Sequence, residues 1–409
     1  MGAMKYWLWL SGQKGISCRA KAAIVRYYRD AEIAFFAPSA EFEKIPGLTK
    51  LEAKLLEKRD LSHAERILAD CTRLGIELIT MQDARYPKRL KNISDPPVLL
   101  YVKGKLPDVD NVPALAIIGT RKATPYGIKM GRKLSYETAK CGGTVISLLT
   151  EGIDREAAKG CLLADGSCIA VLGTGIDRLN SIQRDIITNG ALVSEYPPNM
   201  PSQRHFYRER NRIASGLSHG VIVVEAPEKS GTLLFAAEAL EQGREVFAVP
   251  GNADAINSVG TIELIKQGAK PVTCGWDALE EFEYLFPNTL KRPGGEIEQP
   301  PMPPERAEKA APKAKAQDTT IKDVDKQKSA GYIDLREQLS DLDEEQLKII
   351  SAIEGDSTHV DDIIVRTGLS TAKVLSQLTL LEIKGFIRRS AGRRVSLNIS
   401  KIKVRNNNG

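Results

Sequence analysis

The stretch Ala114-Leu115-Ala116-Ile117-Ile118-Gly119-Thr120-Arg121-Lys122 decides the fold. Five apolar residues have the length of one buried strand, and a glycine, a hydroxyl and two cations follow them directly. Residues 126–140 then have apolar side chains at helical spacing. A buried strand, a short polar loop and a helix form the first half of a βαβ unit. The stretch therefore predicts a strand whose carboxyl end carries a loop with two cations.

The same alternation continues along the chain. Short apolar runs follow at 144–147, 168–172, 191–194, 220–224, 245–249 and 271–272. Stretches long enough for a helix lie between them, at 154–163, 231–242 and 261–267. Continuous apolar strands that alternate with helices indicate a parallel sheet covered on both faces. The predicted fold class is α/β, an extended Rossmann-like, doubly wound parallel sheet.

Four segments make up the 409 residues. Residues 1–80 are expected to form a helical domain, and 81–290 the Rossmann-like domain. Residues 291–340 are rich in Pro, Lys and Glu and predict a flexible linker. Residues 341–400 predict three helices and a hairpin, the pattern of a winged helix. In the first segment, residues 45–53 resemble a helix-hairpin-helix, and an ordinary Pro-Gly turn is the alternative.

Composition excludes several classes of protein. The net charge is +6, which permits a polyanionic partner without demanding one. Six cysteines without a C-x-x-C pair, together with four histidines, predict neither a disulfide framework nor a metal site. No apolar run reaches the length of a membrane helix, and the residues at the start of the sequence lead us to expect no secretory leader. We expect a cytoplasmic protein that does not enter a membrane.

Glycine and hydroxyl residues follow most of the predicted strands. The loops after the strands begin at Gly119, Leu148, Gly173, Glu195, Glu225 and Pro250. In a parallel sheet such loops emerge at the carboxyl edge, where these folds bind ligands. We expect them to converge on one site for a phosphate-bearing ligand, with Ser230-Gly231-Thr232 opening a helix toward it. The third glycine of G-x-G-x-x-G and a Walker A lysine are missing, so no nucleotide cofactor is expected.

Aromatic and basic residues alternate in the segment 203–212, Gln-Arg-His-Phe-Tyr-Arg-Glu-Arg-Asn-Arg. Aromatic faces stack on bases and cations hold the phosphate backbone, which is the combination that single-stranded nucleic acid needs. The alternative is a solvated basic helix face with the aromatic rings packed beneath it. Beside an anion-binding crevice, the first interpretation is favoured.

Catalysis has weaker support from the residues. The carboxylates Asp154, Asp177, Glu195 and Glu225 lie near the predicted crevice and are candidates for an acid/base pair or a metal site. Carboxylates after strands more often cap helices or pair with arginines. No G-x-S-x-G elbow is present. We therefore predict no catalytic residues and no cofactor.

The chain resembles the DNA processing protein A family, also called DprA or Smf. Residues 119–127 are similar to its GxRxxxxYG loop, 152–154 to the end of its SGxAxGID loop, and 172–177 to its LGTGxD loop. Further matches are 86–90, 95–97, 194–198, 210–213, 216–218, 224–226, 229–233 and 247–251. The resemblance is dense from about 81 to 275. The flanking segments agree with the family in their order.

The resemblance implies a bacterial binding protein and not an enzyme. It implies single-stranded DNA in the crevice of the Rossmann-like domain, a homodimer formed through that domain, and loading of RecA recombinase in natural transformation, in the presence of single-strand-binding protein. Arg121 would clamp a phosphate, beside Lys122, and a ring at Phe206 or Tyr207 would stack on a base. The other implied site residues are Gly119, Gly152, Gly173, Gly175, Arg210, Asn211, Arg212, Lys229, Ser230, Gly231 and Thr232.

The sequence also departs from the family pattern. Leu148 replaces a family glycine, and Glu151 occupies the usual arginine position, where an acid facing the crevice weakens phosphate binding. Arg178-Leu179 stands where the family has Tyr-Pro. Three rival functions remain open: a nucleotide sensor, a nucleotide phosphoribohydrolase and a winged-helix regulator. The basic residues near the predicted wing, such as Arg388 and Arg394, suit duplex DNA or a protein partner equally.

Overall fold

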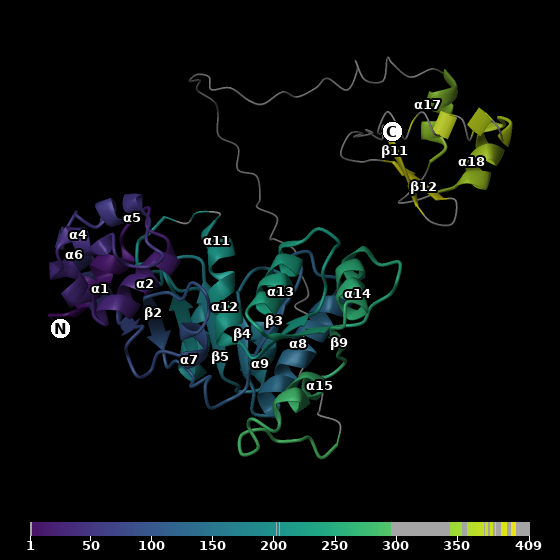
Figure 1. The fold of residues 1–409 in the computed structure, drawn as a ribbon. Coiled ribbons are helices and arrows are strands. Elements are labelled where there is room, and N and C mark those ends of the chain that lie inside the picture. Colours follow the sequence, from purple (N-terminus) through teal and green to yellow (C-terminus); the bar gives the residue numbers. More distant parts are fainter. Residues whose placement is uncertain are drawn as a thin grey trace, which may run out of the picture. The chain divides into compact units, whose positions relative to one another are not determined.

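The computed structural model describes residues 2–201, 203, 205–295, 344–353, 358–371, 373, 374, 377, 378, 381, 386–390 and 394–397. The chain divides into two compact units, Met1–Lys309 and Ala310–Gly409 (Figure 1). Most of the predicted linker 291–340 lies outside the described residues. Each unit is described by itself.

Among the described residues, the first unit contains a nine-stranded sheet in the order β1-β2-β6-β5-β4-β3-β7-β8-β9. Neighbouring strands from β6 to β9 are parallel. These strands are β3 (Ala114–Ile118), β4 (Thr144–Ser147), β5 (Cys168–Leu172), β6 (Ala191–Ser194), β7 (Gly220–Val223), β8 (Glu245–Ala248) and β9 (Lys270–Pro271). The predicted parallel sheet is confirmed, with its strands within a residue or two of the apolar runs.

Two further strands form an antiparallel edge. Strand β2 (Leu99–Gly104) pairs with β6, and β1 (Glu77–Thr80) pairs with β2. Neither strand was predicted from the sequence. Strand β1 is only four residues long, and its apolar pair merges with the preceding helical pattern. The sheet therefore begins at Glu77, inside the segment that was expected to be helical.

The switch point of the sheet lies between β3 and β7. From β3 the chain moves outward through β4, β5 and β6, and it then returns to place β7 on the other side of β3. Strands β3 and β7 are neighbours in the sheet, and the loops that follow them therefore lead away from each other. This is the place where doubly wound sheets bind ligands, outside the carboxyl ends of the strands.

Helices cover both faces of the sheet. Helices α8 (Pro125–Lys140), α9 (Ile153–Leu163) and α10 (Ser181–Asn189) pack in sequence on one face, and α15 (Gly275–Leu279) packs on α8. Helices α12 (Asn211–Leu217) and α13 (Gly231–Glu241) pack together on the other face (Figure 1). Helix α14 (Val259–Lys266) packs on β8. Because both faces are covered, β3, β4 and β5 are buried along their whole length.

Six helices precede the sheet and share its hydrophobic core: α1 (Met4–Ser11), α2 (Cys18–Tyr28), α3 (Ala31–Phe36), α4 (Ser39–Phe42), α5 (Lys50–Leu55) and α6 (Ser62–Leu74). The Ser17 hydroxyl caps α2, and Gly75 ends α6 in the left-handed region. A capping box of Thr49 and Glu52 starts α5 after the Pro46-Gly47 turn. Thr49, which stands where a helix-hairpin-helix has its second glycine, is thus used to cap a short helix.

The second unit is a small winged-helix domain. Its described elements are α17 (Glu344–Ser351), β10 (Thr358–His359), α18 (Val360–Thr367), β11 (Ile387–Ser390) and β12 (Arg394–Leu397), and its sheet has the order β10-β12-β11. The predicted hairpin is confirmed, and β10 adds a short strand to it. Much of the third expected helix, residues 370–384, lies outside the described residues, as do the side chains of Arg388 and Arg394.

In the part of the chain that the structure describes, no helix has both the length and the apolar character needed to cross a bilayer. Among the same residues, no three His, Cys, Asp or Glu side chains come together in an arrangement that suits a metal ion. The six cysteines are all unpaired, and four of them are buried.

Candidate nucleic-acid interface

A crevice of about 570 Å³ opens at the switch point of the sheet. The loop after β3, the loop after β4, the α11 (Phe206–Glu209) to α12 segment and the start of α13 line it. It gathers nine of the predicted site residues: Gly119, Arg121, Tyr207, Arg210, Asn211, Lys229, Ser230, Gly231 and Thr232. Segments more than 100 residues apart in the sequence thus meet at one surface.

The charges that line this crevice are mostly positive. Arg121, Arg208 and Lys229 are exposed, and within the described residues none of them forms an ion pair. Arg210 adds a fourth cation, and Asp154 is the one carboxylate among the lining residues. Cations that have no protein counter-ion attract phosphate groups, so the crevice suits a polyanion.

Arg210 forms part of the floor of the crevice. Its side chain is 3% exposed, and its Nη1 donates to the carbonyl oxygens of Leu148 at 2.7 Å and Val171 at 3.1 Å. Burial lowers the pKa of Arg210 to about 10, against the attraction of the Asp154 carboxylate. The guanidinium carbon lies 5.4 Å from the centre of the Tyr207 ring, a cation–π distance. Arg210 therefore ties the loops beneath the crevice together and supports the ring that lines it.

Asp154 is 2% exposed at the start of α9. The Thr150 hydroxyl donates to its Oδ2 at 2.7 Å, and among the described residues its Oδ1 finds no hydrogen-bond partner. Burial raises the pKa of Asp154 to about 6, although the Thr150 hydrogen bond and the Arg210 charge both work in the other direction. Asp154 is the carboxylate that would repel an anion in this crevice, and its raised pKa means that it loses this negative charge more readily than an ordinary aspartate does.

Helix α13 points its first turn into the crevice. Ser230 is its N-cap, but the hydroxyl accepts no bond from the helix, and its Oγ is buried without a partner. Gly231 is exposed, and an added Cβ would meet nothing within 4 Å. The free backbone N–H groups of an eleven-residue helix with no capping side chain form a ready site for a phosphate oxygen.

Glycines let the loops approach each other closely. A Cβ on Gly119 would meet Ile153, and one on Gly152, whose φ is +86°, would lie 2.3 Å from the Thr120 carbonyl oxygen. A Cβ added to Gly173 would lie 3.1 Å from the Tyr207 ring, and one added to Gly175 would lie 2.4 Å from the Pro197 carbonyl oxygen. Gly152, Gly173 and Gly175 do not line the crevice, so their contribution is to set the positions of the loops around it.

Tyr207 and Phe206 occupy different environments. Tyr207 lines the crevice, whereas Phe206 is buried and stacks on Tyr196 with ring centres 4.0 Å apart. The Tyr196 hydroxyl in turn donates to Glu209 at 2.8 Å. The packed-ring interpretation of the sequence therefore holds for Phe206, whereas Tyr207 lines the crevice and its stacking on a base stays a prediction.

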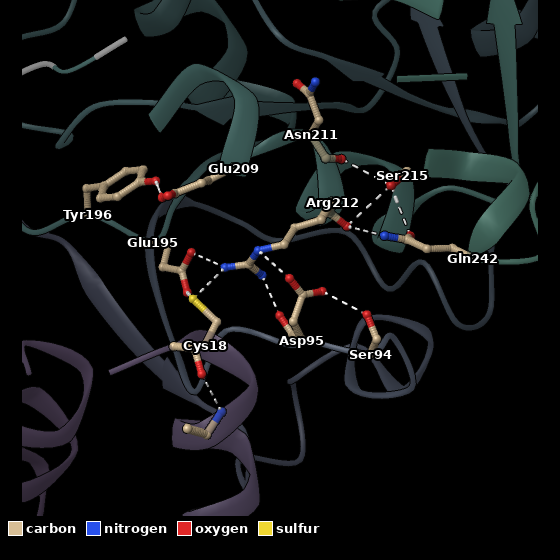
Figure 2. A network of polar contacts seen from close by, with 12 residues as sticks. Cys18, Ser94, Asp95, Glu195, Tyr196, Glu209, Asn211, Arg212, Ser215 and Gln242 are labelled. Atoms are coloured by element: carbon tan, nitrogen blue, oxygen red, sulfur yellow. Dashed lines mark hydrogen bonds and ion pairs between the residues drawn. The ribbon is translucent and has the colours of Figure 1, made fainter. Parts of the chain in front are cut away.

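Arg212 lies outside the crevice, although the sequence placed it at its flank. Its guanidinium is buried where the N-terminal helices meet the sheet, and it forms ion pairs with Glu195 and, at 3.4 Å, with Asp95 (Figure 2). It also donates to the Asp95 carbonyl oxygen at 2.7 Å and to Cys18 Sγ at 3.2 Å. Two carboxylates and two further acceptors satisfy this charge, so Arg212 holds the two parts of the first unit together.

Two of the other predicted carboxylates, Glu225 and Glu195, have structural partners. Glu225 accepts from the backbone N–H and the hydroxyl of Thr124, which anchors the loop after β3. Glu195 pairs with Arg212, as the sequence analysis expected of such acids. Glu151 is exposed and does not line the crevice.

Besides apolar lining residues, three polar or charged crevice residues were not predicted from the sequence: Thr120, Thr150 and Arg208. Arg208 belongs to the aromatic–basic segment and was passed over because the family motif begins at Arg210. Lys122 is exposed but does not line the crevice. Arg204 of the same segment lies outside the described residues.

Comparison with known proteins identifies the family of the chain. A family model described as DNA recombination-mediator protein A matches residues 77–283, and a model of the DprA winged helix domain matches 335–393. A relative named Protein Smf, from Synechocystis sp., is 31% identical over 95% of this chain and 97% of its own length. The chain belongs to the DprA/Smf family.

Two further DprA proteins support this assignment. DNA processing protein DprA from Bacillus subtilis is 39% identical over 54% of this chain and 75% of the relative. The crystal structure of DNA processing protein A from Streptococcus pneumoniae superposes with a TM-score of 0.59 at 30% identity, over 68% of this chain and 98% of that one. The family model starts at residue 77, where β1 starts, so the antiparallel edge belongs to the DprA domain. The chain is a DNA processing protein of the recombination-mediator family.

Proposed function

We propose that this chain binds single-stranded DNA in the crevice at the switch point. The observation that carries the proposal is the combination, on one surface, of three exposed cations without an ion pair among the described residues, the Tyr207 ring and the open N-terminus of α13. Cations and helix N–H groups hold a phosphate backbone, and an aromatic face stacks on a base without selecting its sequence. A duplex keeps its bases stacked on each other, so the ring favours a single strand.

From this activity and the family, we propose a binding protein and not an enzyme. It would act in the cytoplasm as a homodimer that loads RecA recombinase onto single strands during DNA uptake, in the presence of single-strand-binding protein. Membership in a family of recombination mediators supports this role. A mediator needs a grip that tracks the phosphate backbone and leaves other parts of the strand accessible, which an open crevice provides.

A nucleotide sensor is the second candidate. A crevice of about 570 Å³ with one helix N-terminus has the size of a site for a single nucleotide. The two candidates differ in how the affinity depends on strand length. A mononucleotide site gains nothing from additional nucleotides, whereas a single-strand site gains contacts with every nucleotide that reaches a further cation or ring.

The test is fluorescence anisotropy with labelled oligo-dT of increasing length, at two salt concentrations, with matched duplex and a mononucleotide as competitors. Affinity that rises with length, falls with salt and resists the competitors supports the proposal. Efficient competition by the mononucleotide, with no dependence on length, contradicts it and favours the sensor.

A further inference from the structure

A second cavity, of about 920 Å³, opens at the carboxyl edge beside the crevice. It is lined by the end of the loop after β3, by Glu225 after β7, and by the long loop between β8 and α14. The loops of this edge were expected to converge on one site. They divide between two cavities instead, and the second one has no part in the proposed phosphate grip.

One short loop separates the two cavities. Arg121 lines the crevice and Thr124 lines the second cavity, so Lys122 and Ala123 form the ridge between them. The ridge is held on both sides, because the Thr120 hydroxyl accepts from the Lys122 N–H at 3.2 Å and Asn257 Nδ2 donates to the Lys122 carbonyl at 2.9 Å. Three residues span at most roughly 10 Å. A single DNA strand that leaves the crevice past the exposed Lys122 side chain therefore reaches the second cavity within a few nucleotides.

The chemistry of the second cavity differs from that of the crevice. No Lys or Arg is among the described residues that line it, and both Glu225 and Asp254 are acidic, so a phosphate is not its ligand. Glu225 already accepts hydrogen bonds from Thr124 and, at 3.4 Å, from Asn257. The exposed polar side chains that remain in the second cavity are those of Asn252 and Asp254. An amide and a carboxylate are groups that hydrogen-bond to the edge of a base.

Tyr126 provides an aromatic face at this cavity. Its side chain is 47% exposed, and its hydroxyl donates to the Pro250 carbonyl oxygen at 2.8 Å. The hydrogen bond fixes the ring across the cavity that the two loops enclose. A fixed, half-exposed ring is a stacking platform whose ordering costs little when a base binds.

We propose that the second cavity is a nucleobase subsite for the strand whose phosphates occupy the crevice, with the base stacked on Tyr126 and its edge toward Asn252 and Asp254. The proposal rests on the single-strand function proposed above and adds a base preference to it. A carboxylate accepts a hydrogen bond from the exocyclic amino group of cytosine, and thymine has a carbonyl at that position. The subsite therefore favours cytosine over thymine.

The first test maps the contact directly on the full chain. An oligo-dC carrying 5-iodocytosine is crosslinked by ultraviolet light, and the tryptic peptides are identified by mass spectrometry. Tyr126 lies in the peptide 123–129, Ala-Thr-Pro-Tyr-Gly-Ile-Lys, and Tyr207 in the peptide 205–208, His-Phe-Tyr-Arg. Crosslinks on both peptides support the subsite. Crosslinks confined to 205–208 overturn it and leave the crevice assignment intact, whereas a chain that binds no single strand overturns the function and the subsite together.

The second test uses variants. Tyr126→Ala is expected to weaken oligo-dC binding about five- to tenfold, while Tyr126→Phe keeps the ring without its hydrogen bond to Pro250 and is expected to restore most of the affinity. Tyr284→Ala is the matched control, since that ring is 78% exposed and lines neither cavity. Asp254→Asn is expected to remove the preference for dC over dT. Equal affinities of the Tyr126→Ala and Tyr284→Ala variants, or an unchanged base preference in Asp254→Asn, would overturn the subsite.

Discussion

Arg210 and Arg212 lie two positions apart at the start of α12 and serve opposite sides of it. Arg210 donates to the Leu148 carbonyl beneath the crevice, and Arg212 pairs with Glu195 beside the N-terminal helices. Residues two apart on a helix do not share a face, so one short segment connects the binding surface to the domain junction. Tyr207 lies just before this segment, so the position of its ring depends on the contacts of both arginines.

Replacing Arg212 with alanine is expected to destabilise the first unit. The change leaves Glu195 poorly solvated and without its partner, which costs about 3–5 kcal/mol for a buried pair. Urea denaturation followed by tryptophan fluorescence measures it. Arg85→Ala is the matched control, because Arg85 also pairs with two carboxylates, Glu77 and Asp83, but at the surface. Its loss should cost less than about 1 kcal/mol, and equal losses in the two variants would contradict a stabilising role for the buried pair.

Replacing Arg121 with alanine is expected to weaken single-strand binding at every sequence. Removing one phosphate contact should lower the slope of log affinity against log salt by about one. The measurement is anisotropy with oligo-dT across a salt series. Lys105→Ala removes the same charge at the opposite edge of the sheet, just after β2, and should leave the slope unchanged. If both variants keep the wild-type slope, Arg121 does not contact a phosphate.

Replacing Phe206 is expected to lower the stability of the fold, whereas replacing Tyr207 is expected to weaken DNA binding. Phe206→Ala removes a buried ring stacked on Tyr196 and should cost about 3–5 kcal/mol of folding free energy. Tyr207→Ala should leave the melting temperature nearly unchanged and weaken single-strand binding, since stacking on a base contributes about 1–3 kcal/mol. Thermal melts and anisotropy on both variants test this. The reverse pattern would show that Phe206 is the stacking ring.

The adjacent rings Phe206 and Tyr207 illustrate which features of the structure could not be predicted from the sequence. Strands such as β3 and β5 could be predicted because a continuous run of five apolar residues is typical of a buried strand. In a parallel sheet, the loops that follow such strands then lie at one edge. Which of two adjacent rings is buried depends on the direction of α11, and that direction depends on the stacking of Phe206 on Tyr196, which lies ten residues earlier in the chain. The four-residue strand β1 carries too little pattern to separate it from the helix before it.

The division of the edge into two cavities was equally hidden. The sequence places Gly119 and Pro250 after two strands, β3 and β8, whose carboxyl ends lie at the same edge, but the ridge at Lys122 separates them. That ridge depends on an Asn257 hydrogen bond across 135 positions, which no local pattern records.

Acidification is expected to tighten DNA binding. The pKa of Asp154 is raised to about 6 in the folded protein, so its charge in the crevice is lost as the pH falls from 7 to 5. Because the folded pKa lies above the unfolded one, this carboxyl stabilises the fold at low pH, and the gain is lost as the pH rises from about 4 to about 6. Asp154→Asn removes the charge at all pH values. It should bind single strands a few-fold more tightly at pH 7 and show a flatter affinity profile between pH 5 and 7. An equally steep profile in the variant would assign the pH dependence to another group.

Gly152→Ala is expected to damage both the fold and the crevice. Gly152 has a φ of +86°, and its added Cβ would lie 2.3 Å from the Thr120 carbonyl oxygen and 2.8 Å from the Arg121 Cα. Backbone atoms cannot rotate away, so the loop that carries Arg121 must move. Gly243→Ala is the matched control, since Gly243 has a φ of +68° but nothing within 4 Å of its added Cβ. The control should lose only the about 1–2 kcal/mol that a left-handed residue costs, with unchanged DNA affinity. Gly152→Ala should lose more stability than this and bind oligo-dT as weakly as Arg121→Ala. Equal stability and affinity in the two glycine variants would show that the close contact with Thr120 does not set the position of Arg121.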